Sequence, residues 1–152
     1  MAVMHPDDFL AMLEALDRGT LRGLRDRAML SLVFAGGFTG GEVVGLDAGR
    51  DQTRDGRGWI EARDRGLLVT LLDRRGLRRV EIARTASDAS CPVHAVESWL
   101  SFARIARGPL FRRVTGEGRK VGSERLGERE VARLLTRLTT VAGVRMLPRP
   151  PS

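Results

Sequence analysis

The sequence predicts a mostly helical α+β domain that carries a small three-stranded antiparallel sheet. Apolar residues recur at helical spacing in four segments, and three short apolar runs between them are typical of strands. The chain has 152 residues, the length of one ordinary domain, and its balance of 42% hydrophobic and 30% charged residues is that of a globular protein. We therefore expect one domain over residues 1–147 and a disordered, proline-rich tail over 148–152.

The first third of the chain predicts three helices. The first occupies about 6–18, because Pro6 suits a first helical turn and a glycine follows at the other end. The second follows Thr20 and ends at a glycine pair. The third is short and begins at Thr39, because a threonine three residues before Glu42 fits a capping box.

The middle of the chain predicts a polar loop over 47–58 and then the sheet. The glycine and aspartate of the segment Asp73–Gly76 favour a hairpin turn between the second and third strands. The three predicted strands are Trp59–Ala62, Leu67–Leu72 and Arg78–Ala83.

The last third predicts two more helices. One begins at Pro92 and is interrupted at the Gly108-Pro109 pair, and Leu110–Phe111 then forms a short buried anchor. A polar loop over 115–122 leads to a helix from about Glu128 to Ala142. The residues of this helix expected to pack inward against the helix of Val93–Leu100 are Leu134, Leu135, Leu138 and Val141.

Positive charge is concentrated at the C-terminal end. Residues 1–50 have a net charge of −2, residues 51–100 of +1, and residues 101–152, with 12 basic and 4 acidic residues, of +8. An arginine-rich composition can reflect a GC-rich genome, but codon usage alone does not segregate the charge within one chain. The asymmetry favours an anionic partner.

Other features restrict the class of protein. No apolar run is long enough to span a membrane, and the N-terminal residues do not read as a secretory signal. Cys91 is the single cysteine, so no disulfide framework is expected, and with two histidines a metal site is not expected either. We expect a cytoplasmic bacterial protein, nucleoid-associated if it binds DNA, with no cofactor and no membrane partner.

Four segments carry local patterns of one enzyme family. The string GGFTGGEV over Gly36–Val43 is similar to T-G-x-R-x-S-E-L, and CPVHAVESWL over Cys91–Leu100 is similar to C-P-V-x-A-L-x-x-W-L. The third segment is GPLFRRV over Gly108–Val114, and the fourth is the predicted helix of Leu126–Gly143. The order and spacing of these four segments over residues 20–144 resemble the N-terminal part of the catalytic domain of tyrosine recombinases, the phage integrases. The resemblance implies that fold and a role in DNA recombination or integration.

The chain departs from the family at its catalytic positions. Aligned on Glu42, the family's first catalytic arginine falls on Thr39, whose hydroxyl cannot grip a phosphate bidentately. The family's lysine lies in the turn that here contains Arg74 and Arg75, and arginine is a poor general acid. The family's H-x-x-R box and tyrosine are expected after about residue 145, and these 152 residues contain neither. We therefore expect a catalytically inactive member of the family, a pseudoenzyme. Its degenerate catalytic-site positions are Thr39, Glu42, Arg74 and Arg75.

The leading functional expectation is a catalytically inactive, recombinase-like protein that binds DNA without sequence preference. Two alternatives stay open: a protein-interaction module, which self-associates or binds a recombinase through apolar surface, or a fragment of a longer recombinase. The residues expected to contact DNA are Arg74, Arg75, Arg112, Arg113, Arg119, Lys120, Arg125, Arg129, Arg133 and Arg137.

Overall fold

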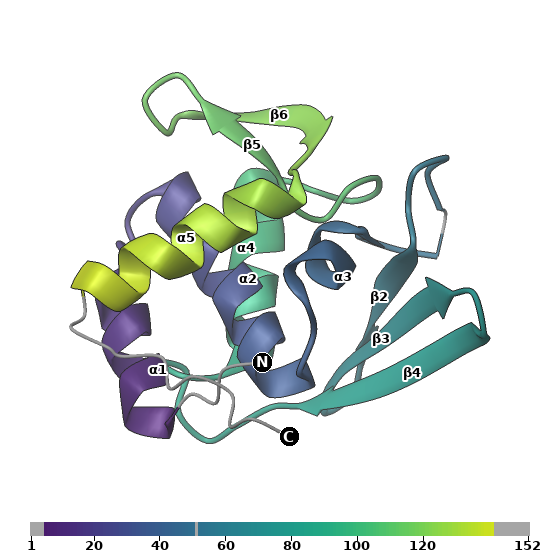
Figure 1. Ribbon diagram of the computed structural model, residues 1–152, viewed down its shortest axis with the longest axis horizontal. Coiled ribbons are helices and arrows are strands. Elements are labelled where there is room, and N and C mark those ends of the chain that lie inside the picture. The colour runs from purple at the N-terminus through teal and green to yellow at the C-terminus, as the bar shows by residue number, and fades with distance from the viewer. Residues whose placement is uncertain (1–4, 51, 142–152) are drawn as a thin grey trace, which may run out of the picture.

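The computed structural model describes residues 5–50 and 52–141 and places the helices on one side of a twisted sheet (Figure 1). The predicted tail, 148–152, lies outside the described residues. The helices are α1 (Pro6–Glu14), α2 (Leu21–Gly36), α3 (Gly40–Val44), α4 (Pro92–Ala103) and α5 (Glu128–Val141). The strands are β1 (Leu46–Asp47), β2 (Gly58–Arg63), β3 (Gly66–Asp73), β4 (Gly76–Ala83), β5 (Arg112–Thr115) and β6 (Lys120–Arg125).

The main sheet has four strands in the order β1-β2-β3-β4, so the prediction of three antiparallel strands was incomplete. The three predicted strands are present and pair antiparallel, but β1 adds a parallel edge, with Leu46 opposite Gly58 and Asp47 opposite Trp59. The extra strand forms because the loop after Asp47 folds back on it: the backbone N–H of Thr53 donates to the Asp47 carboxylate at 2.7 Å. Two residues are too few to show the alternation that identifies a strand in a sequence.

The segment predicted as a polar loop over 115–122 is largely a second, two-stranded sheet, β5–β6. Its turn uses three consecutive residues at positive φ, Gly116, Glu117 and Gly118. The hairpin escaped prediction because Val114 is its one buried strand residue, so its sequence has no alternating apolar pattern. Figure 1 shows it projecting beyond the N-terminal half of α5.

The predicted helix ends agree with the structure for α2 and α3, whereas α1 ends at Glu14, before the predicted end at about residue 18. The capping box of α3 is complete, with both the Thr39 and the Glu42 side chains accepting backbone N–H groups. The Thr20 hydroxyl caps α2, and Gly37 ends that helix at a φ of 66°. Helix α4 ends earlier than predicted, at Ala103, because Arg104 takes the left-handed conformation.

The core lies between α2, α4 and the inner face of the sheet. Leu110 and Phe111 are fully buried, as predicted, and the carbonyl of Leu110 accepts a hydrogen bond from the Trp99 indole at 2.8 Å. Leu134 and Leu138 of α5 are also buried, but α5 packs mainly on α1, α2 and α3, not on α4 as predicted. The reason is the Gly40-Gly41 pair of α3: a Cβ at position 40 would lie 3.3 Å from Val131. The side chain of Val141 lies outside the described part of the chain.

Candidate functional site

The predicted degenerate positions meet at one cavity of about 540 Å³, where α3, the loop before β2, the β3–β4 turn and the start of α5 come together. Thr39, Glu42 and Arg74 line it, whereas Arg75 does not. The β3–β4 turn is a two-residue turn, since Asp73 pairs with Gly76, as the sequence predicts. The structure therefore brings together three of these four residues, which come from distant parts of the chain.

The polar groups of the Thr39 and Glu42 side chains form the N-terminal cap of α3. The Thr39 hydroxyl accepts the N–H of Glu42 at 3.1 Å, and Glu42 Oε1 accepts the N–H of Thr39 at 2.9 Å. The second carboxylate oxygen of Glu42 pairs with Arg78 of β4 at 2.9 Å. The geometry thus shows a cap and an ion pair, and Arg78 is a partner that the sequence pattern did not indicate.

The wall of the cavity carries several carboxylates. Glu128, the first residue of α5, lies over α3: a Cβ at Gly41 would be 3.3 Å from its carboxyl group. The acidic residues that line the cavity are Glu42, Asp55, Asp73 and Glu128, and the basic ones are Arg57, Arg74 and Arg125. Arg125 is bound to Asp47 and Asp55, as described next, which leaves Arg57 and Arg74 as the lining cations that pair with no acidic group of residues 5–50 or 52–141.

Arg125, which was predicted to contact DNA, forms hydrogen bonds and ion pairs within the protein. Its side chain is 12% exposed and the Asp47 side chain that it pairs with is fully buried. The guanidinium donates to Asp47 Oδ1 at 2.5 Å, to Thr53 Oγ1 at 2.8 Å and to Asp55 Oδ2 at 3.1 Å. It also donates to the carbonyl oxygens of Val44 and Leu46, at 2.8 and 2.9 Å.

This network changes the acidity of its members. Hydrogen bonds from Arg125 and then Thr53 hold the pKa of Asp55 at about 2. Burial lowers the pKa of Arg125, but its hydrogen bonds to Asp55 and Asp47 outweigh burial and raise it. We expect Arg125 to stay charged and Asp55 to stay ionised at neutral pH. Ion pairs and hydrogen bonds of Arg125 therefore hold β6 against β1 and the loop before β2.

Arg112, which was also predicted to contact DNA, donates hydrogen bonds to two backbone carbonyls. Its Nε donates to the carbonyl of Pro109 at 2.7 Å, and a terminal nitrogen donates to the carbonyl of Arg107. Burial lowers the pKa of this guanidinium. Arg137 of α5 lies 3.5 Å from the buried carboxylate of Asp26, although its own side chain is 59% exposed.

Arginines near the start of α2 hold the β5–β6 hairpin. Arg22 donates to the carbonyl of Val114 at 3.0 Å, and Arg25 donates to the carbonyl of Arg112 at 3.2 Å while pairing with Asp26 at 2.9 Å. Burial raises the pKa of Asp26 against the opposing effect of Arg25. These arginines therefore position the hairpin and are not free surface charges.

The remaining predicted cations are exposed. Arg113 and the Arg119-Lys120 pair lie on the β5–β6 hairpin, and Arg129 lies on α5; none of them forms an ion pair with residues 5–50 or 52–141. Arg133 is exposed and 3.8 Å from Glu130. In Figure 1 the hairpin and α5 are neighbours, and the β3–β4 turn, which contains Arg74 and Arg75, forms the right-hand edge of the main sheet. Arg74 lines the same cavity as Glu128 at the start of α5, whereas Arg75 does not line it.

Comparison with known proteins gives one informative relative. The chain is 27% identical over 136 residues to a protein described as "Integrase/recombinase xerD homolog" from Selenomonas ruminantium. The match supports a relationship to the tyrosine recombinase family. It covers 86% of this chain but 37% of that protein, so the chain spans little more than a third of its relative's length. No family model matches the chain.

Two structural features are absent from the part of the chain that the structure describes. Among the described residues, none of the helices has the length and apolar character that crossing a bilayer requires. The same residues contain no group of three or more histidine, cysteine or acidic side chains placed to hold a metal ion.

Proposed function

We propose that this chain is a DNA-binding, recombinase-like unit that contacts the phosphate backbone through the β5–β6 hairpin and the start of α5. The observation that carries the proposal is the set of exposed cations on these two adjacent elements, in a chain with an integrase/recombinase relative. Arg113, Arg119, Lys120 and Arg129 have guanidinium or ammonium groups free for phosphate, and such contacts carry no base information. Binding is therefore independent of sequence.

We infer further that the 152 residues by themselves perform no strand cleavage. Phosphoryl transfer needs positive charge and hydrogen-bond donors directed at the phosphate. In the cavity at Thr39, that residue caps α3, four carboxylates line the wall, and Arg125 is already bound to Asp47 and Asp55, so that Arg57 and Arg74 are the remaining cations. The sequence also contains no tyrosine to form a covalent link with DNA.

The chain should neither nick nor relax supercoiled plasmid, and no covalent protein–DNA product should appear on a substrate designed to trap one. Thr39→Arg should not restore strand cleavage. The substitution would remove the hydroxyl that caps α3, and the guanidinium would pair with Glu42 and Glu128 and not with phosphate. The measurement is denaturing electrophoresis of labelled DNA after incubation. A labelled protein adduct from either form of the chain would refute the inferred inactivity.

A second candidate function, self-association, is favoured by one apolar groove. The groove, of about 340 Å³, lies between α1, the end of α2 and the end of β4. Leu10 and Phe34 line it with 39% and 37% of their surface exposed, and the Phe34 ring stacks on that of Phe9 with the centroids 4.1 Å apart. Contiguous exposed apolar surface of this kind is typical of interaction sites.

If a second copy covers this groove, Phe34→Lys should shift the chain toward monomer in sedimentation velocity, because a charge would be buried in the interface. Leu77→Lys, at a residue 58% exposed on β4, is the matched control and should leave the oligomeric state unchanged. A wild-type chain that stays monomeric at about 100 μM, where even a weak homodimer with micromolar affinity would form, would eliminate this candidate.

A further inference from the structure

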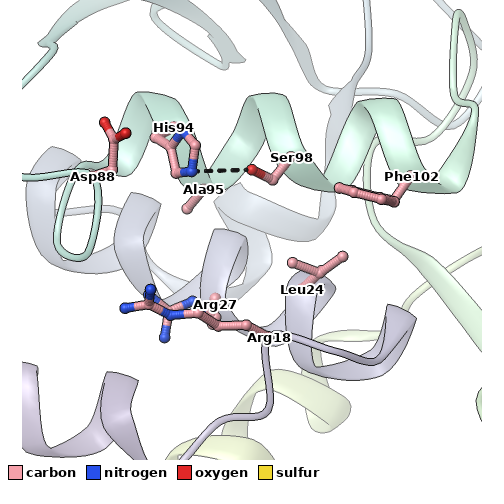
Figure 2. Close-up of a pocket in the computed structure, with 8 residues that line it drawn as sticks. All are labelled: Arg18, Leu24, Arg27, Asp88, His94, Ala95, Ser98 and Phe102. Atoms are coloured by element: carbon pink, nitrogen blue, oxygen red, sulfur yellow. Dashed lines mark hydrogen bonds between the residues drawn. The ribbon is translucent and has the colours of Figure 1, made fainter.

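A separate cavity of about 180 Å³ lies between α2 and α4, away from the recombinase-like site (Figure 2). One wall is a single face of α4, since His94, Ser98 and Phe102 follow one another at intervals of four residues. Figure 2 shows them in a row, with the Ser98 hydroxyl and the His94 ring nitrogen 3.5 Å apart. Phe102 is 69% exposed, the most exposed large hydrophobic residue in the described chain.

The opposite wall holds two arginines. Arg27 of α2 is 6% exposed and donates to the carbonyls of Leu13 at 2.7 Å and of Ala89 at 2.8 Å. A guanidinium has five N–H groups, so these two bonds leave donors unused. Arg18, from the turn between α1 and α2, lies beside it in Figure 2.

The two guanidinium groups have no acidic partner in the structure. Neither Arg18 nor Arg27 forms an ion pair with any described residue, although Asp88 lies on the same cavity rim. Burial, and then the charge of Arg18, lower the pKa of Arg27. Two adjacent like charges repel each other, and an anion placed between them would lower their energy.

The rest of the lining is apolar. Leu24 of α2 and Ala95 of α4 form the floor, and the exposed ring of Phe102 stands at the edge. A simple inorganic anion would leave this surface in water. We propose that the cavity binds a carboxylate that carries an apolar or aromatic group, with the carboxylate at Arg18 and Arg27 and the apolar group against Leu24 and Phe102. Guanidinium groups suit a planar carboxylate because they can donate two parallel hydrogen bonds.

The test is an amide-resolved NMR titration of the full chain with N-acetylphenylalanine, which joins a carboxylate to an aromatic ring. We expect shifts in the amides of Ser98 and Phe102 and a dissociation constant on the order of 1 mM, typical of a fragment of this size. N-acetylphenylalanine amide, which lacks the charge, should bind at least about tenfold more weakly, since hydrogen bonds to charged groups are the stronger ones. Inorganic phosphate, which lacks the ring, should also bind more weakly.

Two variants separate this site from general attraction of anions to a basic protein. Arg18→Gln should weaken N-acetylphenylalanine binding by roughly tenfold, whereas Arg63→Gln, an equal change of charge on β2, should leave it unchanged. Phe102→Ala removes an exposed ring, so it should preserve the fold and still weaken binding. The proposal is overturned if the amide or phosphate binds as tightly as the acid, if both arginine variants behave alike, or if about 20 mM ligand shifts no cavity amide.

Discussion

Replacing Arg125 with methionine should lower the free energy of unfolding by about 3 to 5 kcal/mol. The substitution keeps much of the side-chain volume but leaves the fully buried carboxylate of Asp47 without its counter-charge. The carbonyl oxygens of Val44 and Leu46 lose a donor as well. Urea unfolding monitored through tryptophan fluorescence gives the comparison with wild type.

The matched control is Arg119→Met on the β5–β6 hairpin, where the side chain is exposed and the change should stay within about 0.5 kcal/mol. Dependence on pH is a second measure. The pKa of Asp55 lies at about 2, below its ordinary value of 3.8, so its stabilising contribution is present above pH 4 and is lost as pH falls toward 2. Arg125→Met should reduce that loss. A cost below 1 kcal/mol for Arg125→Met would show that the network does not stabilise the fold.

DNA binding should largely disappear when the exposed cations of the hairpin and α5 are neutralised together. The four changes are Arg113→Gln, Arg119→Gln, Lys120→Gln and Arg129→Gln. The wild-type chain should bind DNA duplexes of unrelated sequence with similar dissociation constants, on the order of 10⁻⁴ to 10⁻⁶ M at physiological salt. Because phosphate neutralisation supplies essentially all of such binding, the fourfold variant should show no measurable association in fluorescence anisotropy up to the solubility of the protein.

The fold of the variant should be retained, since none of the four side chains pairs with an acidic group in residues 5–50 or 52–141. The control is an equal loss of charge on the loop before β2 and on the main sheet, at Arg54, Arg63, Arg65 and Arg79, all of them exposed. Arg22 and Arg25 would be unsuitable in this control because both hold the hairpin through backbone carbonyls.

The sequence predicts those features of this structure whose interacting residues lie close together along the chain. The capping box of Thr39 and Glu42 is local, and it forms as the spacing indicates. The turn that contains Arg74 and Arg75 is equally local and was also predicted. By contrast, the pair of Asp47 and Arg125 joins residues 78 positions apart, and no periodicity in the sequence points to it.

The same distinction explains which contacts at the candidate site the sequence did not indicate. Charge counts identify a basic C-terminal third but cannot show that Arg112 and Arg125 turn inward to backbone and carboxylate acceptors. The position of α5 likewise depends on a close approach to Gly40, which a helical apolar stripe does not specify. Asp47 directly follows Leu46 in the mostly apolar segment 43–46, which favours burial of its carboxylate, but nothing in the sequence indicates Arg125 as its partner.

The salt dependence of DNA binding tests the central claim most directly, because it counts the phosphate contacts made by the hairpin and α5. With three to five contacts, log affinity plotted against log salt concentration should have a slope of about −3 to −4.5 for wild type. The control variant should keep that slope, and stepwise neutralisation of Arg113, Arg119, Lys120 and Arg129 should reduce its magnitude by close to one unit per residue. Equal slopes for the hairpin and control variants would contradict the proposed interface and leave the charge asymmetry of the chain without a function in DNA binding.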